Sequence, residues 1–211
     1  SLTHVHRTRI KICGLTREED VRAVVESGAD AIGFVFYPPS PRYVSFQRAA
    51  ELARLVPPFV TIVGLFVNPA RHYVEEALET VPLQVLQFHG DESEADCTGY
   101  GLPYLKAARM RPGLDLLKYA ASFPSAQGLL LDAFVEGYGG GGETFDWSLI
   151  PSVLPLPLIL SGGLHAGNVA EAVRCVRPWA VDVSSGVEAA KGIKDAARIT
   201  EFVAGVQNAH G

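Results

Sequence analysis

The sequence predicts an α/β protein, a single (β/α)8 TIM barrel, and three observations support this. Eight short apolar runs recur along the 211 residues, at the spacing of βα units of about 20–30 residues. Segments with helix signals separate these runs, and the last two runs stop abruptly at Gly/Ser clusters. Strands that alternate with helices and are buried on both faces close most naturally into such a barrel.

The expected strands are residues 10–13, 31–36, 60–67, 84–88, 104–107, 129–131, 158–160 and 180–183. An open, doubly wound sheet is the alternative architecture. That fold usually has a G-x-G-x-x-G loop after its first strand, whereas this chain has Cys13 followed by GLT.

The expected helices are 17–27, 46–55, 70–80, 91–97, 114–122, a brief one at 147, 168–175 and 194–206. Thr16 and Ser45 have side chains that suit N-caps, and Gly28 suits the end of the first helix. Asn68 and the following proline should open the third helix, and Asp91 the fourth.

Composition excludes several function classes. The net charge is −5 without a basic block, which argues against a nucleic-acid partner. No apolar run reaches the ~18–20 residues of a membrane span, so no membrane partner is expected. Cys13, Cys97 and Cys175 are too widely spaced for a zinc motif or disulfide framework, which favours a reducing cytoplasm.

The two Gly/Ser clusters predict an anion site. The first follows the seventh run with Gly162 and Gly163, and the second follows the eighth with Ser184, Ser185 and Gly186. Glycines allow close backbone approach, and helix N-termini direct free N–H groups toward an anion. Consecutive loops of this kind near the end of a barrel suggest one phosphate held between them, although each could be an ordinary βα turn.

Candidate catalytic residues lie where barrel strands end. Cys13 ends the first strand and Asp132 follows the sixth, so a thiol and a carboxyl would form a proton-acceptor and proton-donor pair. A buried structural cysteine and a helix-capping aspartate are the alternatives. Arg42, on a proline-rich loop, could hold a carboxylate or be a solvated surface residue. His89, which follows the fourth strand, could be a site residue or a structural histidine bonded to the backbone.

The ordered motifs resemble the phosphoribosylanthranilate isomerase family over nearly the whole chain. They are KICG (11–14), GFVF (33–36), SPR (40–42), GLFV (64–67), QFHG (87–90), LD (131–132), FDW (145–147), SGGL (161–164) and DVSSGVE (182–188). The resemblance implies a (β/α)8 barrel of tryptophan biosynthesis. It would convert N-(5′-phosphoribosyl)anthranilate by an Amadori rearrangement, without cofactor or metal.

The resemblance also implies roles for individual residues. Cys13 would be the general base and Asp132 the general acid, with Arg42 holding the anthranilate carboxylate. His89 and Asp182 would line the substrate pocket. The phosphate would be bound by backbone groups of the glycines and serines of the two clusters named above.

Some expectations concern the chain as a whole. Residues 1–8 match nothing in the family and read as an extension, with residues 9–211 as one barrel domain. The glycine run at 139–142 reads as a lid or a surface loop, and Gly141 and Glu143 depart from the family pattern there. The small phosphorylated aminosugar substrate is the expected partner, and the protein is expected to be a cytoplasmic monomer or homodimer. The alternative functions are another sugar-phosphate isomerase barrel, indole-glycerol-phosphate synthase or a non-catalytic phosphate-binding barrel.

Overall fold

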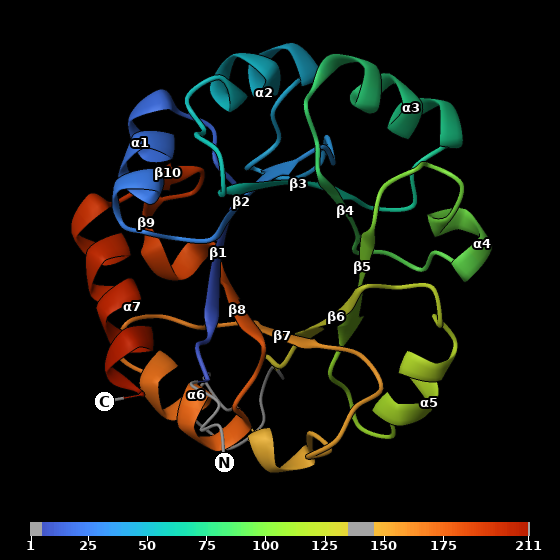
Figure 1. Ribbon diagram of the computed structural model, residues 1–211, viewed down its shortest axis with the longest axis vertical. Coiled ribbons are helices and arrows are strands. Elements are labelled where there is room, and N and C mark those ends of the chain that lie inside the picture. The colour runs from blue at the N-terminus through green and yellow to red at the C-terminus, as the bar shows by residue number, and fades with distance from the viewer. Residues whose placement is uncertain (1–5, 135–145, 211) are drawn as a thin grey trace.

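The computed structural model describes residues 6–134 and 146–210, and in these residues eight parallel strands form a closed barrel. The strands are β1 Arg9–Cys13, β2 Ala31–Val35, β3 Thr61–Phe66, β4 Val85–Phe88, β5 Tyr104–Arg109, β6 Gly128–Asp132, β7 Leu158–Ser161 and β8 Ala180–Val183. Each strand pairs in parallel with the next, and β1 also pairs with β8 to close the ring. The predicted fold is therefore confirmed (Figure 1).

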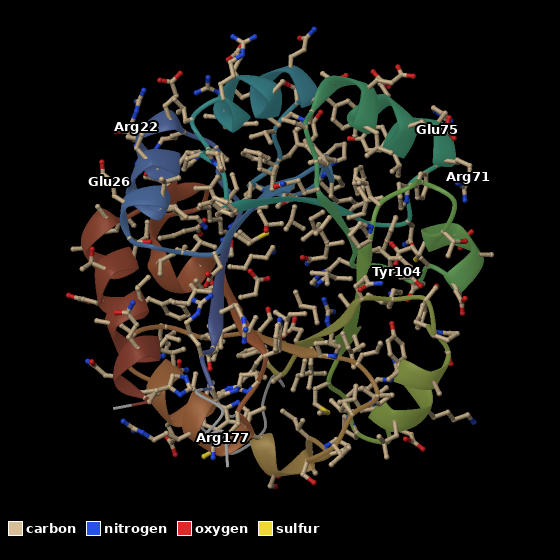
Figure 2. The ribbon with its side chains drawn as sticks, in the orientation of Figure 1. Arg22, Glu26, Arg71, Glu75, Tyr104 and Arg177 are labelled. Carbon is tan, nitrogen blue, oxygen red and sulfur yellow. The ribbon has the colours of Figure 1, made fainter. Side chains whose placement is uncertain are left out.

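Helices surround the barrel on the outside (Figure 1). They are α1 Glu18–Glu26, α2 Phe46–Ala53, α3 Arg71–Thr80, α4 Glu94–Cys97, α5 Leu116–Ala121, α6 Val169–Val176 and α7 Ala196–Asn208, with 3-10 turns η1 Trp147–Leu149 and η2 Ser185–Val187. Their apolar faces pack against the outward-facing strand residues, such as Phe34, Phe66 and Phe88. Charged side chains such as Arg22 and Glu75 point away from the barrel (Figure 2).

Four predicted helix starts differ from the structure. Helix α3 has Ala70 as its N-cap, so Asn68 and the proline after it precede the helix, and α7 begins at Ala196 after an Asp195 cap, because Lys194 belongs to a strand. Thr16 does not cap α1, because Arg17 occupies the N-cap position and the Thr16 hydroxyl donates to the carbonyl of Gly192. Helix α4 is capped by Ser93 instead of Asp91, since Ser93 and Asp96 form a reciprocal capping box. Ser45 does cap α2 as predicted, accepting a hydrogen bond from the amide of Arg48.

A short antiparallel hairpin, which the sequence pattern does not reveal, follows η2. It consists of β9 (Glu188–Ala190) and β10 (Ile193–Lys194) and lies beside α1 (Figure 1). The carboxylate of Asp20 accepts from the backbone amide of Lys194, which ties the hairpin to α1. The hairpin thereby places Glu188 and Lys194, both buried, next to the end of β8.

The first and last described residues lie close together, next to the start of β1. Thr8 is buried and its hydroxyl lies 2.9 Å from a ring nitrogen of His210, and the rings of His6 and His210 are in contact. The division into residues 1–8 and 9–211 stays a prediction, and the glycine run at 139–142 lies outside the described residues.

Candidate active site

A buried ion pair occupies the barrel interior where β1 and β8 adjoin. Lys11 and Asp182 are opposite each other in the strand register, and Lys11 Nζ lies 3.2 Å from Asp182 Oδ1. Burial by itself lowers the pKa of Lys11, but Asp182 and Cys13 more than offset this, so its pKa lies above the ordinary value. Lys11 is therefore a fixed positive charge in the floor of the site.

Cys13 follows Lys11 by two residues on β1, so the alternation of side chains along the strand places both on the inner face of the barrel. Gly33 on β2 makes room for it, because a Cβ on that glycine would stand 2.6 Å from the sulfur. Cys13 is only 4% exposed, and burial raises the pKa of the thiol although Lys11 and Lys194 act in the opposite direction. Burial thus favours the protonated thiol, whereas the ammonium groups of Lys11 and Lys194 favour the thiolate.

Asp132 ends β6 and stands opposite Ser161 of β7 in the register. Its Oδ1 accepts a hydrogen bond of 3.1 Å from the amide of Phe134. Gly162 packs directly against the carboxylate, because a Cβ there would lie 2.1 Å from Oδ1. The half-buried carboxyl group is consequently held at the edge of the first glycine loop.

A cavity of about 360 Å³ joins Asp132 to both Gly/Ser loops. Its wall consists of Asp132, Phe134, Ser161, Gly162, Gly163, Leu164, Asp182, Val183, Ser184, Ser185 and Gly186. Gly162 and Gly163 have φ of +91° and +64°, which favour glycine. A Cβ on Gly186 would stand 1.9 Å from the carbonyl oxygen of Leu164, so this position accepts only glycine without movement. The structure therefore brings the two predicted anion loops together around one cavity.

Arg42 is engaged by a partner that the sequence analysis did not single out. Its guanidinium donates two hydrogen bonds, of 2.9 and 2.6 Å, to the carboxylate of Glu188. Burial alone would raise the pKa of Glu188, but Arg42 and Lys194 outweigh it and hold that pKa below the ordinary value. Lys194 Nζ lies 3.1 Å from the same carboxylate and also donates to the carbonyl of Ser184 in the second loop.

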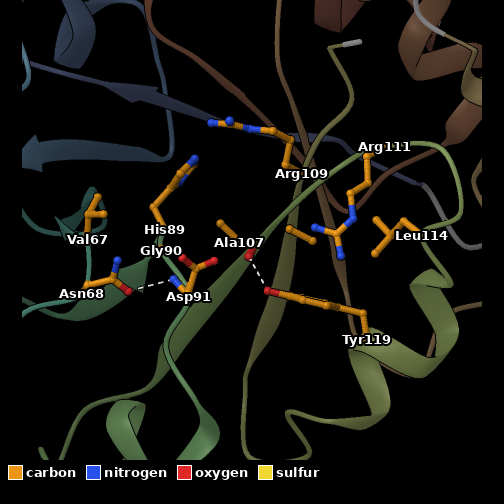
Figure 3. Close-up of a pocket in the computed structure, with 11 residues that line it drawn as sticks. Val67, Asn68, His89, Gly90, Asp91, Ala107, Arg109, Arg111, Leu114 and Tyr119 are labelled. Carbon is orange, nitrogen blue, oxygen red and sulfur yellow. Dashed lines mark hydrogen bonds between the residues drawn. The ribbon is translucent and has the colours of Figure 1, made fainter.

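His89 follows β4 and lines a different cavity, of about 330 Å³, at the ends of β4 and β5 (Figure 3). Its Nδ1 lies 3.2 Å from Nε2 of the buried Gln87. Burial lowers the pKa of His89, while Asp182 and Asp132 oppose that shift, so the neutral ring is the favoured form. The same two carboxylates therefore act on His89 and line the cavity at the Gly/Ser loops.

The comparisons with known proteins agree along almost the entire chain. Residues 10–205 match the family model described as N-(5′-phosphoribosyl)anthranilate isomerase. The enzyme of that name from Dechloromonas aromatica is 69% identical over 203 residues, covering 96% of this chain and 98% of the relative. The one from Methylibium petroleiphilum is 64% identical, covering 96% and 95%.

Solved structures agree as well. The phosphoribosyl anthranilate isomerase of Thermotoga maritima is 42% identical and superposes with a TM-score of 0.86, covering 95% of this chain and 99% of that one. A structure of such an isomerase in complex with reduced 1-(o-carboxyphenylamino)-1-deoxyribulose 5-phosphate is 40% identical, with a TM-score of 0.83 and coverage of 95% and 99%. The chain belongs to the N-(5′-phosphoribosyl)anthranilate isomerase family.

Membership of this isomerase family confirms the resemblance seen in the sequence motifs. The roles given to individual residues stay predictions. Asp132, Asp182 and the five loop residues line one cavity, and His89 lines the second. Cys13 and Arg42 line neither of these two cavities, and Cys13 lies two residues beyond Lys11 on the inner face of β1.

Glu188 and Lys194 also belong to the site, although no sequence pattern singled them out. Lys11 belongs to a motif, but the sequence does not determine whether its side chain points into or out of the barrel.

Within residues 6–134 and 146–210, no cluster of three or more His, Cys, Asp or Glu side chains is arranged to hold a metal ion. No helix in that part of the chain is long and apolar enough to cross a membrane.

Proposed function

We propose that the protein catalyses the Amadori rearrangement of N-(5′-phosphoribosyl)anthranilate to 1-(2-carboxyphenylamino)-1-deoxyribulose 5-phosphate, a step of tryptophan biosynthesis. Family membership supports the reaction. The observation that carries the mechanism is the cavity in which Asp132 adjoins both Gly/Ser loops, to which we assign the phosphate. A phosphate bound to the amides of Gly162, Gly163 and Gly186 fixes the substrate with its sugar beside that carboxyl group.

The proposed first step opens the sugar ring. Asp132, in its acid form, gives a proton to the ring oxygen as the bond between that oxygen and C1′ breaks. The lone pair of the anthranilate nitrogen forms a C=N bond to C1′, which leaves a protonated Schiff base. Asp132 is then a carboxylate, held in place by the amide of Phe134.

The proposed second step removes the proton from C2′. Cys13 as thiolate takes this proton, and the electron pair of the broken C–H bond forms the C1′=C2′ bond of an enolamine. Lys11 and Lys194 stabilise the thiolate, which offsets part of the cost of burying a negative charge. Protonation of C1′ and loss of the proton from the 2′ hydroxyl then give the ketone. In this last step the Cys13 thiol gives its proton to C1′ and the Asp132 carboxylate takes the proton of the 2′ hydroxyl, so both residues return to their starting forms and substrate and product contain the same atoms.

Single substitutions test these assignments. Cys13→Ala and Asp132→Asn should each reduce kcat by about 10²- to 10⁴-fold, with product affinity little changed. The assay follows the loss of phosphoribosylanthranilate fluorescence. Cys175→Ala is the matched control, because that thiol is exposed on α6. A near-normal kcat in either variant would refute the catalytic role of the residue that was replaced. If the folded wild-type protein showed no turnover, a non-catalytic phosphate-binding barrel would be the remaining function.

We further propose that the protein is a homodimer instead of a monomer. A solved structure that is 38% identical and covers 95% of this chain is described as generated monomers of the dimeric isomerase of T. maritima, so that relative is a dimer before the change. Phe59 is fully exposed here and has φ of +71°, a conformation uncommon for a bulky residue. An aromatic side chain held outward in this way suits burial in a second copy. Light scattering should give twice the chain mass for the wild type and the monomer mass for Phe59→Ser, and a monomeric wild type would refute the proposal.

A further inference from the structure

The carboxylate of Glu188 takes no part in the proton transfers proposed above, although it lies at the site and its side chain is only 4% exposed. Its Oε1 accepts a hydrogen bond from Nη2 of Arg42. Its Oε2 accepts from Nε of Arg42, from the amide of Gly192 and from Nζ of Lys194. A buried carboxylate with this many donors is held in one orientation, so it also fixes the groups that bind it.

Glu188 contacts Arg42 along one edge of the planar guanidinium group. The two bonds, of 2.9 and 2.6 Å, come from Nε and Nη2, which form the side edge of the group. A guanidinium has five N–H donors, and this pairing uses two of them. Within residues 6–134 and 146–210, no side chain or carbonyl group accepts a hydrogen bond from Nη1, so the end edge between Nη1 and Nη2 stays open. Arg42 can therefore bind Glu188 and a second carboxylate at the same time.

Arg42 stands close to Cys13 and to the second Gly/Ser loop. Its stem lies over Gly14, because a Cβ on that glycine would be 2.8 Å from Cδ of Arg42 and 2.9 Å from Oγ of Ser184. The hydrogen bond to Glu188 raises the pKa of Arg42 against the effect of burial, and the nearby charge of a Cys13 thiolate also raises it. The Arg42 side chain is 21% exposed, so a ligand at the proposed general base can reach it.

The hairpin of β9 and β10 holds Glu188 in place before any ligand binds. Lys194 is completely buried, lies 3.1 Å from the carboxylate, and also donates to the carbonyl and the hydroxyl group of Ser184. Gly192, in the turn of the hairpin, packs on the loop of Arg42, since a Cβ there would be 3.2 Å from the carbonyl oxygen of Pro41. The hairpin thus connects the Arg42 loop to the second Gly/Ser loop through one carboxylate.

We propose that Glu188 is a positioning residue, which holds the side edge of Arg42 and thereby directs the end edge at the carboxylate of the substrate's anthranilate group. This inference rests on the proposed function and on the role that the family resemblance gives to Arg42. A guanidinium that is already held does not lose the freedom of a long side chain on binding. Glu188 therefore contributes to affinity without contacting the substrate.

Calorimetry with two stable ligands tests the inference. One is reduced 1-(o-carboxyphenylamino)-1-deoxyribulose 5-phosphate, and the other is the same compound without its carboxyl group. A glutamine side chain presents one acceptor and one donor group, so it cannot accept both bonds from Arg42. Glu188→Gln should weaken binding of the carboxylated ligand about tenfold, the cost of ordering one long side chain, and leave the other ligand unchanged. Circular dichroism verifies that the variant is folded.

Variants of Arg42 show whether Glu188 acts through that residue. Arg42→Ala should remove the preference for the carboxylated ligand, and adding Glu188→Gln to it should cause no further loss. Arg42→Lys retains the charge but cannot offer two edges, so it should also lose most of the preference. This variant leaves Glu188 intact, and it tests the geometry even if Glu188→Gln does not fold.

Glu79→Gln, on the exposed face of α3, is the matched control and should bind both ligands as the wild type does. Equal binding of the two ligands by the wild type would overturn the inference. So would an equal loss for both ligands in Glu188→Gln, no loss in that variant, a further loss in the double variant, or a full preference in Arg42→Lys. Turnover is measured separately, so an inactive wild type with the expected binding pattern would refute the proposed function and retain this inference.

Discussion

Lys11 and Asp182 form an ion pair of 3.2 Å inside the barrel, with side chains only 6% and 7% exposed. The pair stands directly beneath Cys13, and the charge of Lys11 favours the thiolate that the proposed mechanism requires. Asp182 neutralises part of that charge and acts in the opposite sense on the thiol. The protonation of Cys13 is therefore set by a balance between burial, the two cations Lys11 and Lys194, and the anion Asp182.

Lys11→Met should move the pH dependence of kcat/KM toward higher pH. A general base acts only when it is deprotonated, so activity rises as pH rises through the pKa of Cys13. Loss of the ammonium group raises that pKa further, and activity at pH 7 should fall about ten- to a hundredfold. Rates measured from pH 6 to 10 should converge with those of the wild type at the alkaline end. Lys118→Met, at an exposed position of α5, is the control, and an unshifted profile would contradict the role of Lys11.

Gly186→Ala should abolish tight phosphate binding. The added Cβ would stand 1.9 Å from the Leu164 carbonyl oxygen, so the second loop would have to separate from the first. Affinity for inorganic phosphate should fall more than about tenfold, because the backbone donors no longer converge. Titration calorimetry gives the measurement. Gly113→Ala is the control for backbone strain away from the loops, since Gly113 has φ of +81° but no atom lies within 4 Å of its added Cβ; an equal loss there would show that the effect is not local.

The sequence was sufficient to predict the barrel because its strands are apolar on both faces and its helices have recognisable starts. The errors arise where several capping residues lie close together. Asp91 and Ser93 can both open a helix, and only the pairing of Ser93 with Asp96 three residues later separates them. The amide of Asp91 is instead bound by the side chain of Asn68, a contact across 23 positions that no local pattern reveals.

The candidate site was only partly predictable for a related reason. The Gly/Ser loops are contiguous in sequence, so their pattern is visible. The pairing of Arg42 with Glu188 spans 146 positions and depends on a hairpin with no sequence signal. Burial of Lys194 follows from the same hairpin, so its contact with Ser184 could not be foreseen.

Lys106→Met should strongly destabilise the protein. Lys106 is completely buried, and its Nζ lies 3.2 Å from Glu92 and 2.9 Å from the carbonyl oxygen of Gly90. Removing one member of a buried ion pair leaves an uncompensated charge and costs about 3–5 kcal/mol. The free energy of unfolding in urea gives the measurement. Combining Lys106→Met with Glu92→Gln should recover part of the loss, whereas additive losses would show that the two side chains do not interact.

Glu188→Gln should destabilise the protein near pH 7 but not in acid. The pKa of Glu188 in the folded state lies below its ordinary value of 4.5, because the hydrogen bonds from Arg42 and the charge of Lys194 outweigh burial. A lowered pKa means that the unfolded chain binds the proton more readily. The stabilisation is therefore fully present above the ordinary pKa and is lost as pH falls through the folded-state value.

The expected difference for Glu188→Gln is about 1.5–3 kcal/mol at pH 7, the cost of losing hydrogen bonds to a charged group. Urea unfolding of wild type and variant from pH 7 to pH 3 should show this difference shrinking below about pH 4.5. Glu79→Gln on the exposed face of α3 is the control and should differ little from the wild type throughout. A Glu188→Gln difference that stays constant over this range would mean that packing, and not charge, holds the hairpin against the barrel.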